Sequence, residues 1–233
     1  VGLFAGANID ASGDAGGGEV LVGGNFQGNG TERNASRTFV AGDASIAADA
    51  ITAGNGGRVI VWADEITRYN GDISATGGAT AGNGGFVEVS GKQKLVFNGS
   101  VDLAAANGSG GDLLLDPANI TISGGGDANT AGFTAGGDAA AQTEAFAEDD
   151  GLDSVFDVAN SFTGVGAGTT IRLQATNNIT LANNLVLAAA TGSANVSLIL
   201  DAGRNIAINA NLTADGTGAI TLNADASSDG SGA

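Results

Sequence analysis

Carboxylates are the most frequent side chains in this sequence that could bind a ligand or transfer a proton. Asp and Glu number 25 against 8 Lys and Arg. One acidic stretch could form a docking lobe for a cation or a partner, and it contains Glu144, Glu148, Asp149, Asp150 and Asp153. A solvated helix face is the simpler explanation of such a run. Loose Ca²⁺ binding by outward Asp and Asn, for instance Asp127 in GGGDAN, is a further hypothesis because Ca²⁺ prefers oxygen ligands.

Neighbouring carboxylates raise the possibility of acid–base chemistry on a polysaccharide. Asp64 with Glu65 and Asp149 with Asp150 are candidate pairs, and glycosidases use two carboxylates that face each other. Adjacent residues of a strand point to opposite faces, which argues against the first pair. The sequence has no His and no Cys, so it cannot form a Ser-His-Asp triad, a thiol nucleophile or a conventional zinc site. We therefore expect a noncatalytic protein without a cofactor, and a polysaccharide-active enzyme is the less favoured alternative.

Aromatic and basic side chains supply the other candidate contacts. Trp62, Tyr69, Arg58 and Arg68 could contact a glycan or a protein partner. Trp62 follows an inward Val61 in an alternating run, so its indole is expected to face outward and could stack on a sugar ring. The alternative is that Trp62 lies beneath the neighbouring insertion and covers apolar surface.

The overall charge limits the classes of partner. A formal net charge of −17 excludes a protein that binds nucleic acid chiefly through phosphate, because that requires clustered Lys and Arg. The longest apolar runs are a few residues long, which predicts no membrane insertion. Val1 is not an initiator and no signal peptide is evident, so we expect a piece of a longer chain or a processed product.

A recurring phrase predicts the elements that position these residues. LLLDPANITI from Leu113 resembles LILDAGRNIAI from Leu198, and each has two alternating apolar runs joined by a polar corner. Seven positions mark the recurrence, namely Val20, Val59, Val87, Leu113, Ile171, Leu198 and Ile220. Four of the six intervals between them are 22 to 28 residues long, which suits three short strands and three corners. Because one repeat cannot bury its own apolar face, the recurrence predicts stacked coils of a parallel β-solenoid.

Alternation within the runs indicates which residues face the core. A period of two is typical of a strand with one buried face. Val59 and Val61 are expected to point inward, whereas four residues are expected to point to water, namely Arg58, Glu88, Asp112 and Thr221. Glycine is frequent, 41 of 233 residues, and the tetrapeptide GNGG occurs at both 54–57 and 82–85, as sharp corners require.

Two insertions interrupt the recurrence and divide the chain. We expect a first solenoid segment over 1–122 with a loop near 25–43, an acidic and partly helical insertion over 123–168, and a second segment over 169–233. A helix is predicted from Asp138 to Gly151, followed by a helical turn over 153–158. Phe146, Phe156 and Phe162 are predicted to anchor this insertion to the solenoid.

Two stretches carry a resemblance to a known family. The segment from Gly54 to Ser123, GNGGRVIVWADEITRYNGDISATGGATAGNGGFVEVSGKQKLVFNGSVDLAAANGSGGDLLLDPANITIS, and the opening from Val1 to Gly24 resemble filamentous haemagglutinin-like exoproteins of bacterial two-partner secretion. The resemblance implies an all-β, right-handed parallel β-helix that is secreted or held at the surface of a Gram-negative-type bacterium. Members serve as adhesins, fibres of a biofilm matrix or stalks, and the family's N-terminal secretion domain is not evident here.

Repeat and resemblance together predict a noncatalytic extracellular shaft segment with a structural or adhesive role. We expect it to join head to tail into a filament through open end coils, so its partners are copies of itself or further repeats of a longer chain. Host or matrix glycans are the other expected partners, and a glycan-binding adhesin module is the alternative function.

Overall fold

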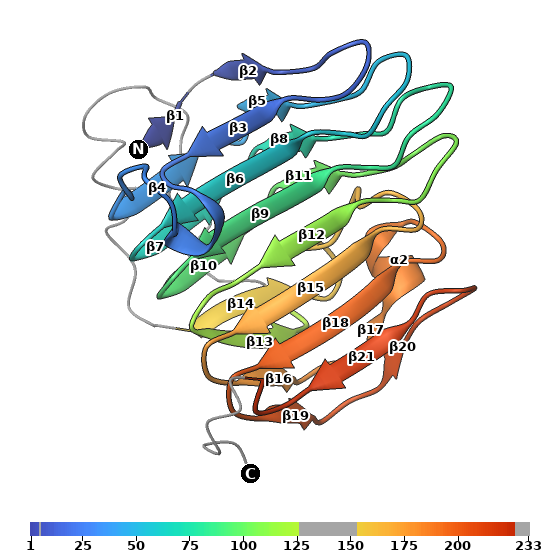
Figure 1. The fold of residues 1–233 in the computed structure, drawn as a ribbon. Helices are drawn as coiled ribbons and strands as arrows, with labels where there is room; N and C mark the ends of the chain where they lie inside the picture. The colour runs from blue at the N-terminus through green and yellow to red at the C-terminus, as the bar shows by residue number, and fades with distance from the viewer. Residues whose placement is uncertain (5, 126–152, 227–233) are drawn as a thin grey trace.

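The computed structural model is an all-β protein in which all strand pairings between described residues are parallel. It describes residues 1–4, 6–125 and 153–226. Figure 1 shows the strands of the largest sheet lying one above another, from the N-terminal end at the top to the C-terminal end at the bottom. The described helices are short: η1 is a 3-10 turn at Phe26–Gly28, and α2 spans Leu187–Thr191.

The largest sheet has one strand from each repeat. Among the described residues its strands are, in spatial order, β3 (Glu19–Val22), β6 (Arg58–Ala63), β9 (Phe86–Gly91), β12 (Asp112–Leu115), β15 (Thr170–Ala175), β18 (Ser197–Ala202) and β21 (Ile220–Asn223).

Shorter strands form the remaining sheets. One N-terminal sheet contains β1 (Gly2–Leu3), β4 (Arg37–Val40), β7 (Ile66–Tyr69) and β10 (Lys94–Phe97). The other contains β2 (Asn8–Asp10), β5 (Ser45–Ala47), β8 (Asp72–Ser74) and β11 (Ser100–Asp102).

The C-terminal part has two further sheets. One contains β14 (Asp153–Asp157), β13 (Asn119–Ser123), β16 (Ile179–Leu181) and β19 (Ile206–Ile208), and the other contains β17 (Leu185–Val186) and β20 (Leu212–Thr213).

The predicted register of the recurrence is confirmed. All seven marker positions are paired in sequence across the largest sheet, from Val20 with Val59 to Leu198 with Ile220. The pairing of Leu113 with Ile171 passes over the whole acidic insertion without a shift of register. A shift of one residue would move every buried side chain to the other face, so the shared apolar core enforces this alignment.

The core consists of aligned rows of aliphatic side chains. Val59, Val87, Leu113, Ile171 and Leu198 have no exposed surface, and a second row two residues further along is buried in the same way. Burying one Val or Leu side chain contributes about 1.5 to 3 kcal/mol. Each added coil therefore extends one continuous core.

Corner residues form ladders of their own. Asn55 Oδ1 accepts a hydrogen bond from the Asn83 backbone N–H at 2.9 Å, and Asn83 Oδ1 accepts one from the Ser109 N–H at 3.0 Å. Both GNGG corners contain a first glycine in the left-handed region, with φ of +105° at Gly54 and +123° at Gly82. A Cβ would lie 2.2 Å from a backbone carbonyl oxygen at Gly54 and 1.8 Å from one at Gly82, so these two positions have no space for a side chain.

The described part of the acidic insertion differs from the prediction. The predicted helical turn over 153–158 is wrong, because residues 153–157 form β14, which pairs with β13. Buried and more exposed residues alternate along this segment, which is the pattern of a strand. Ser154 and Phe156 are fully buried, and the Leu95 backbone N–H donates to Ser154 Oγ at 2.8 Å. Phe156 and Phe162 pack in the core as predicted. The predicted helix over 138–151 and Phe146 lie outside the described residues.

One further expectation is corrected. The loop near 25–43 is shorter than predicted, because residues 37–40 form β4. In the apolar run LVLAAA only Leu185–Val186 is strand, and the following residues form α2. Alanine is the strongest helix former, and the left-handed Gly192, with φ of +71°, ends the helix.

Candidate functional site

The outer face of the largest sheet is partly covered by the loop over residues 23–36, hereafter the covering loop. Trp62 on β6 faces this loop and is 4% exposed. A Cβ on Gly28 would lie 2.6 Å from Trp62 Cζ2, so the loop backbone rests directly on the indole. Trp62 Nε1 donates a hydrogen bond to Asp64 Oδ1 at 3.1 Å. Trp62 is thus buried under the insertion, as the alternative hypothesis stated, and does not present a sugar-stacking platform.

A buried carboxylate lies beneath the same loop. Glu88 on β9 is fully buried, although it was predicted to point to water. Its carboxylate oxygens accept from the Gln27 backbone N–H at 3.2 and 3.1 Å, and Gln27 has a left-handed φ of 53°. Burial raises the pKa of Glu88 to about 7, while the hydrogen bond from Gln27 and the charge of Arg58 act in the opposite direction.

A second carboxylate with similar properties follows β12. Burial raises the pKa of Asp116 to about 7, and the nearby charge of Glu88 contributes to the rise. Gln174 on β15 donates from Nε2 to Asp116 Oδ2 at 3.2 Å. A carboxyl group with a pKa near neutrality is the kind of group that can hold or release a proton at a functional site.

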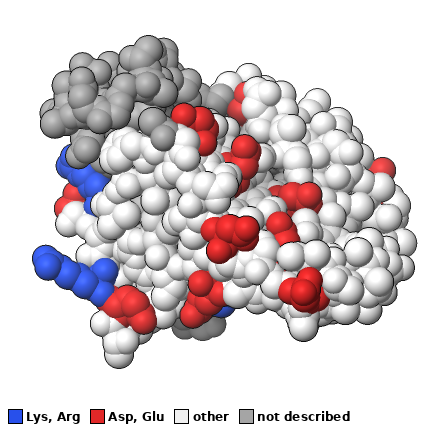
Figure 2. Space-filling view, turned by 90° about the horizontal axis from the view of Figure 1, so that it is seen from above, with Lys and Arg blue, Asp and Glu red and all other residues white. Residues whose placement is uncertain are grey.

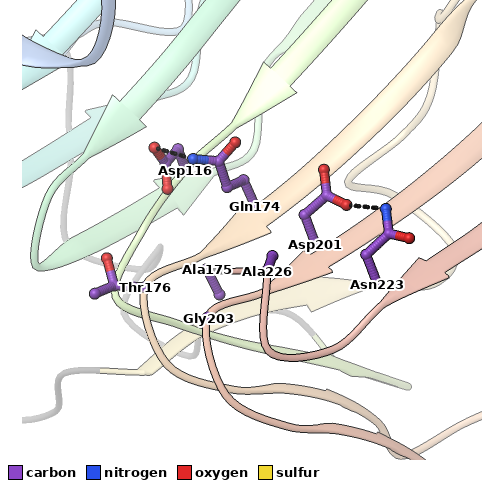
Figure 3. Close-up of a pocket in the computed structure, with 8 residues that line it drawn as sticks. All are labelled: Asp116, Gln174, Ala175, Thr176, Asp201, Gly203, Asn223 and Ala226. Carbon is purple, nitrogen blue, oxygen red and sulfur yellow. Dashed lines mark hydrogen bonds between the residues drawn. The ribbon is translucent and has the colours of Figure 1, made fainter. Parts of the chain in front are cut away.

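Three hollows adjoin around Gln174 on this outer face. Two of them, of about 270 and 260 Å³, lie against the covering loop and include Gln27 in their lining. The third, of about 560 Å³, extends toward β21 and includes Asp116, Asp201 and Asn223. Figure 3 shows the third hollow, with the Asp116–Gln174 and Asp201–Asn223 pairs projecting from successive strands. We call the three together the outer groove.

The four predicted contact residues do not form one surface. Arg58 is partly exposed, forms an ion pair with Glu19 and lies 5.8 Å from the centroid of the Phe26 ring. Tyr69 is a core residue with no exposed surface: its ring stacks on Phe97 at 5.2 Å and its hydroxyl donates to the Ser100 carbonyl at 2.7 Å. Arg68 on β7 is 6% exposed and is likewise not available to a ligand.

The acidic lobe falls almost wholly outside the described residues. Glu144, Glu148, Asp149 and Asp150 are not described, and neither is Asp127 of the proposed Ca²⁺ corner. Asp153 is described and is the exposed first residue of β14. In the parts of the chain that the structure describes, no three Asp, Glu, His or Cys side chains gather closely enough to hold a metal ion.

The candidate enzyme pair Asp64 and Glu65 is divided between different partners. Asp64 Oδ1 accepts from Trp62 and from Asn34 Nδ2, whereas Glu65 forms an ion pair with Arg37 at 3.2 Å. Both residues lie in the turn between β6 and β7 rather than on a strand. The two carboxylates therefore do not face each other across a cleft, as the two carboxylates of a glycosidase do.

Sequence reasoning missed the residues of the outer groove, although a signal was present. Asp116, Gln174 and Asp201 each follow the apolar run of the recurring phrase, in LLLD, IRLQ and LILD. Their recurrence at one position of the repeat places them in one row, because Leu115 pairs with Leu173 and Gln174 with Asp201. No pattern in the sequence indicates that Glu88 is buried, because the covering loop lies far from Glu88 along the chain.

Charge is unevenly distributed on the face of the molecule shown in Figure 2. Most of the basic side chains visible there lie toward one side of the view, whereas acidic side chains are spread across the face. Among the described residues, no helix is long and apolar enough to cross a membrane.

Comparison of the sequence with protein-family models and with curated proteins gives no match.

Proposed function

We propose that this chain is a segment of a noncatalytic extracellular shaft with a structural and adhesive role. In this proposal the parallel strands wind as a right-handed β-helix with about three strands per coil. The chain is secreted, or held at the surface of a Gram-negative-type bacterium, as its resemblance to filamentous haemagglutinin-like exoproteins implies.

The in-register pairing of all seven marker positions supports this proposal most directly. Val20, Leu113 and Ile220 belong to one row although 200 positions of sequence separate the first from the last. A row of this kind has no intrinsic end, because each coil contacts only its two neighbours. Length and stiffness, rather than a reaction centre, are what such an arrangement supplies.

The C-terminal coil supports growth by end-to-end stacking. Within the described residues β21 pairs with β18 alone, so its other edge has unpaired backbone groups. Three apolar side chains on this last coil are exposed, with exposures of 40% for Ile208, 37% for Ile220 and 47% for Leu222. Leu222 continues the inward row of Leu200, its partner in the register. A further coil, from another copy or from more repeats of a longer chain, is the natural cover for this surface.

A matched pair of charge substitutions tests the stacking. Leu222→Asp places a carboxylate in the inward row of β21, whereas Thr221→Asp places one on the outer face of the same strand. We expect wild-type protein and Thr221→Asp to form rods that lengthen with concentration in negative-stain images, and Leu222→Asp to remain monomeric. Monomeric wild-type protein at about millimolar concentration, or equal behaviour of the two variants, contradicts end-to-end stacking of copies.

A further inference from the structure

Polar side chains repeat along the outer groove at one position of each strand. Gln174 pairs in register with Asp201, and Asp201 with Asn223, while Asp116 accepts the hydrogen bond of Gln174 from the strand before. Adjacent strands lie about 4.8 Å apart, so the row offers a polar group at that interval along the stacking axis. It is therefore a linear array of hydrogen-bonding groups.

The groups in this array have unused hydrogen-bonding capacity. Asn223 Nδ2 donates to Asp201 Oδ1 at 2.5 Å, and Gln174 Nε2 donates to Asp116 Oδ2 at 3.2 Å. An amide has two N–H donors and a carbonyl acceptor, and an ionised carboxylate accepts about four hydrogen bonds. Asp201 also forms an ion pair with Arg172, and Asp116 also has a side-chain hydrogen bond with Gln27. Among the hydrogen bonds between described residues, each amide still uses only one of its two N–H donors and each carboxylate only part of its acceptor capacity. Donors and acceptors thus lie side by side, which is the combination that hydroxyl groups require.

The loop end of the outer groove contains an aromatic pair. Phe26 and Phe86 form an edge-to-face pair with ring centroids 5.8 Å apart, and Phe26 is 37% exposed. Leu114 and both rings line the hollow of about 270 Å³. Aromatic faces beside a few placed polar groups are typical of a ligand site, and they suit the C–H face of a sugar ring.

The charges of the outer groove favour some polymers over others. Asp112, Asp116 and Asp201 contribute carboxyl groups to its lining, while Lys92 and Arg172 contribute positive charges, and Arg172 forms an ion pair with Asp201. The lining therefore has no excess of positive charge to attract a phosphate or uronate chain. A neutral hydroxylated chain needs no such charge.

We propose that the outer groove binds an extended neutral oligosaccharide that lies along the stacking axis. One sugar unit contacts the polar row at each coil, and the pair of Phe26 and Phe86 holds the end of the chain at the covering loop. The site gives the shaft a ligand of its own. It does not rest on end-to-end stacking, because its side chains lie on the outer face of the sheet, and of those named only Asn223 belongs to the end coil.

Binding is tested with three neutral hexasaccharides: cellohexaose, fully N-acetylated chitohexaose and maltohexaose. Titration calorimetry is done in the Leu222→Asp background, so that failure to form rods cannot be mistaken for failure to bind. We expect saturable binding of at least one hexamer. Gln174→Ala and Phe86→Ala are each expected to weaken it at least tenfold, while Thr180→Ala on β16, in a different sheet, leaves it unchanged. Far-UV circular dichroism verifies that each variant is folded.

Three results would overturn the proposal. The first is no binding of any of the three hexamers. The second is equal binding by the wild-type groove and by both groove variants. The third is binding of hexagalacturonate or hexalysine, rather than a neutral hexamer, that depends on Gln174 and Phe86.

Discussion

Glu88 illustrates how one buried side chain can depend on a contact far away in sequence. Its position in β9 is outward, yet the covering loop removes it from water and the Gln27 N–H is aimed at its carboxylate. The charge of Arg58 lowers the pKa of Glu88, and the charge of Glu88 in turn raises the pKa of Asp116. Because burial opposes ionisation, the folded chain holds the Glu88 proton to higher pH than the unfolded chain does.

This proton makes stability depend on pH. The pKa of Glu88 is about 7 in the folded chain against an ordinary value of 4.5, so the folded state binds more protons between these values. The free energy of unfolding therefore falls as pH rises through this window and levels off above it. We expect Glu88→Gln to gain roughly 2 to 3 kcal/mol relative to wild type between pH 4.5 and pH 8, measured by urea unfolding.

Glu65→Gln is the matched control for this experiment, because Glu65 lies at the surface with its side chain 41% exposed. Asp116 titrates in the same window, so the Glu88 variant retains part of the slope. If the two variants lose stability with pH as steeply as wild type does, Glu88 is not the group responsible.

At the scale of elements, the corners determine how closely successive coils approach. A Cβ on Gly82 would lie 1.8 Å from the Gly54 carbonyl oxygen, and the φ of +123° at Gly82 disfavours any side chain. The backbone of one corner thus packs directly against the backbone of the next corner. Only glycine allows this separation while the strands on either side keep their parallel hydrogen bonds.

Gly82→Ala is expected to lower the free energy of unfolding by at least about 2 kcal/mol, because it adds both a backbone clash and left-handed strain. Gly42→Ala is the control, since a Cβ there would meet its nearest atom, the Asn70 carbonyl oxygen, at 3.6 Å. Chemical unfolding of both variants measures the difference. Similar losses in the two variants would show that corner stacking does not determine the stability.

At the scale of the whole molecule, the core is enclosed in its middle and open at its C-terminal coil. Leu113 on β12 and Ile171 on β15 have no exposed surface, whereas Ile220 on β21 is 37% exposed although it belongs to the same row. Among the described residues, the coil that contains β21 has a neighbour on one side only and so has half of the stacking contacts. Stability should accordingly decrease toward β21.

Hydrogen exchange can measure this gradient. We expect the amides of β12 and β15 to exchange at rates set by global unfolding, and those of β21 to exchange at least about a hundredfold faster through local opening. Under conditions that produce rods, protection of β21 is expected to rise toward that of β15. Uniform protection along the column in the monomer would contradict the coil-by-coil account.

The sequence by itself determined the strands of the largest sheet, their inward rows and their register, but not β14, where a helical turn was predicted. Alternation identifies Val59 and Val61 as core residues, and recurrence of the phrase from Leu113 to Leu198 aligns the coils, because both signals come from neighbouring residues that share one buried face.

Only the tertiary structure decided which outward residues are exposed. Trp62 and Glu88 are buried because a loop that ends 26 residues before Trp62 in the sequence folds over them, and no local pattern encodes that contact. The groove of Asp116, Gln174 and Asp201 likewise exists only once stacking brings three separate repeats together. Local periodicity sets which face a side chain takes, whereas burial of the outer face depends on contacts between distant segments.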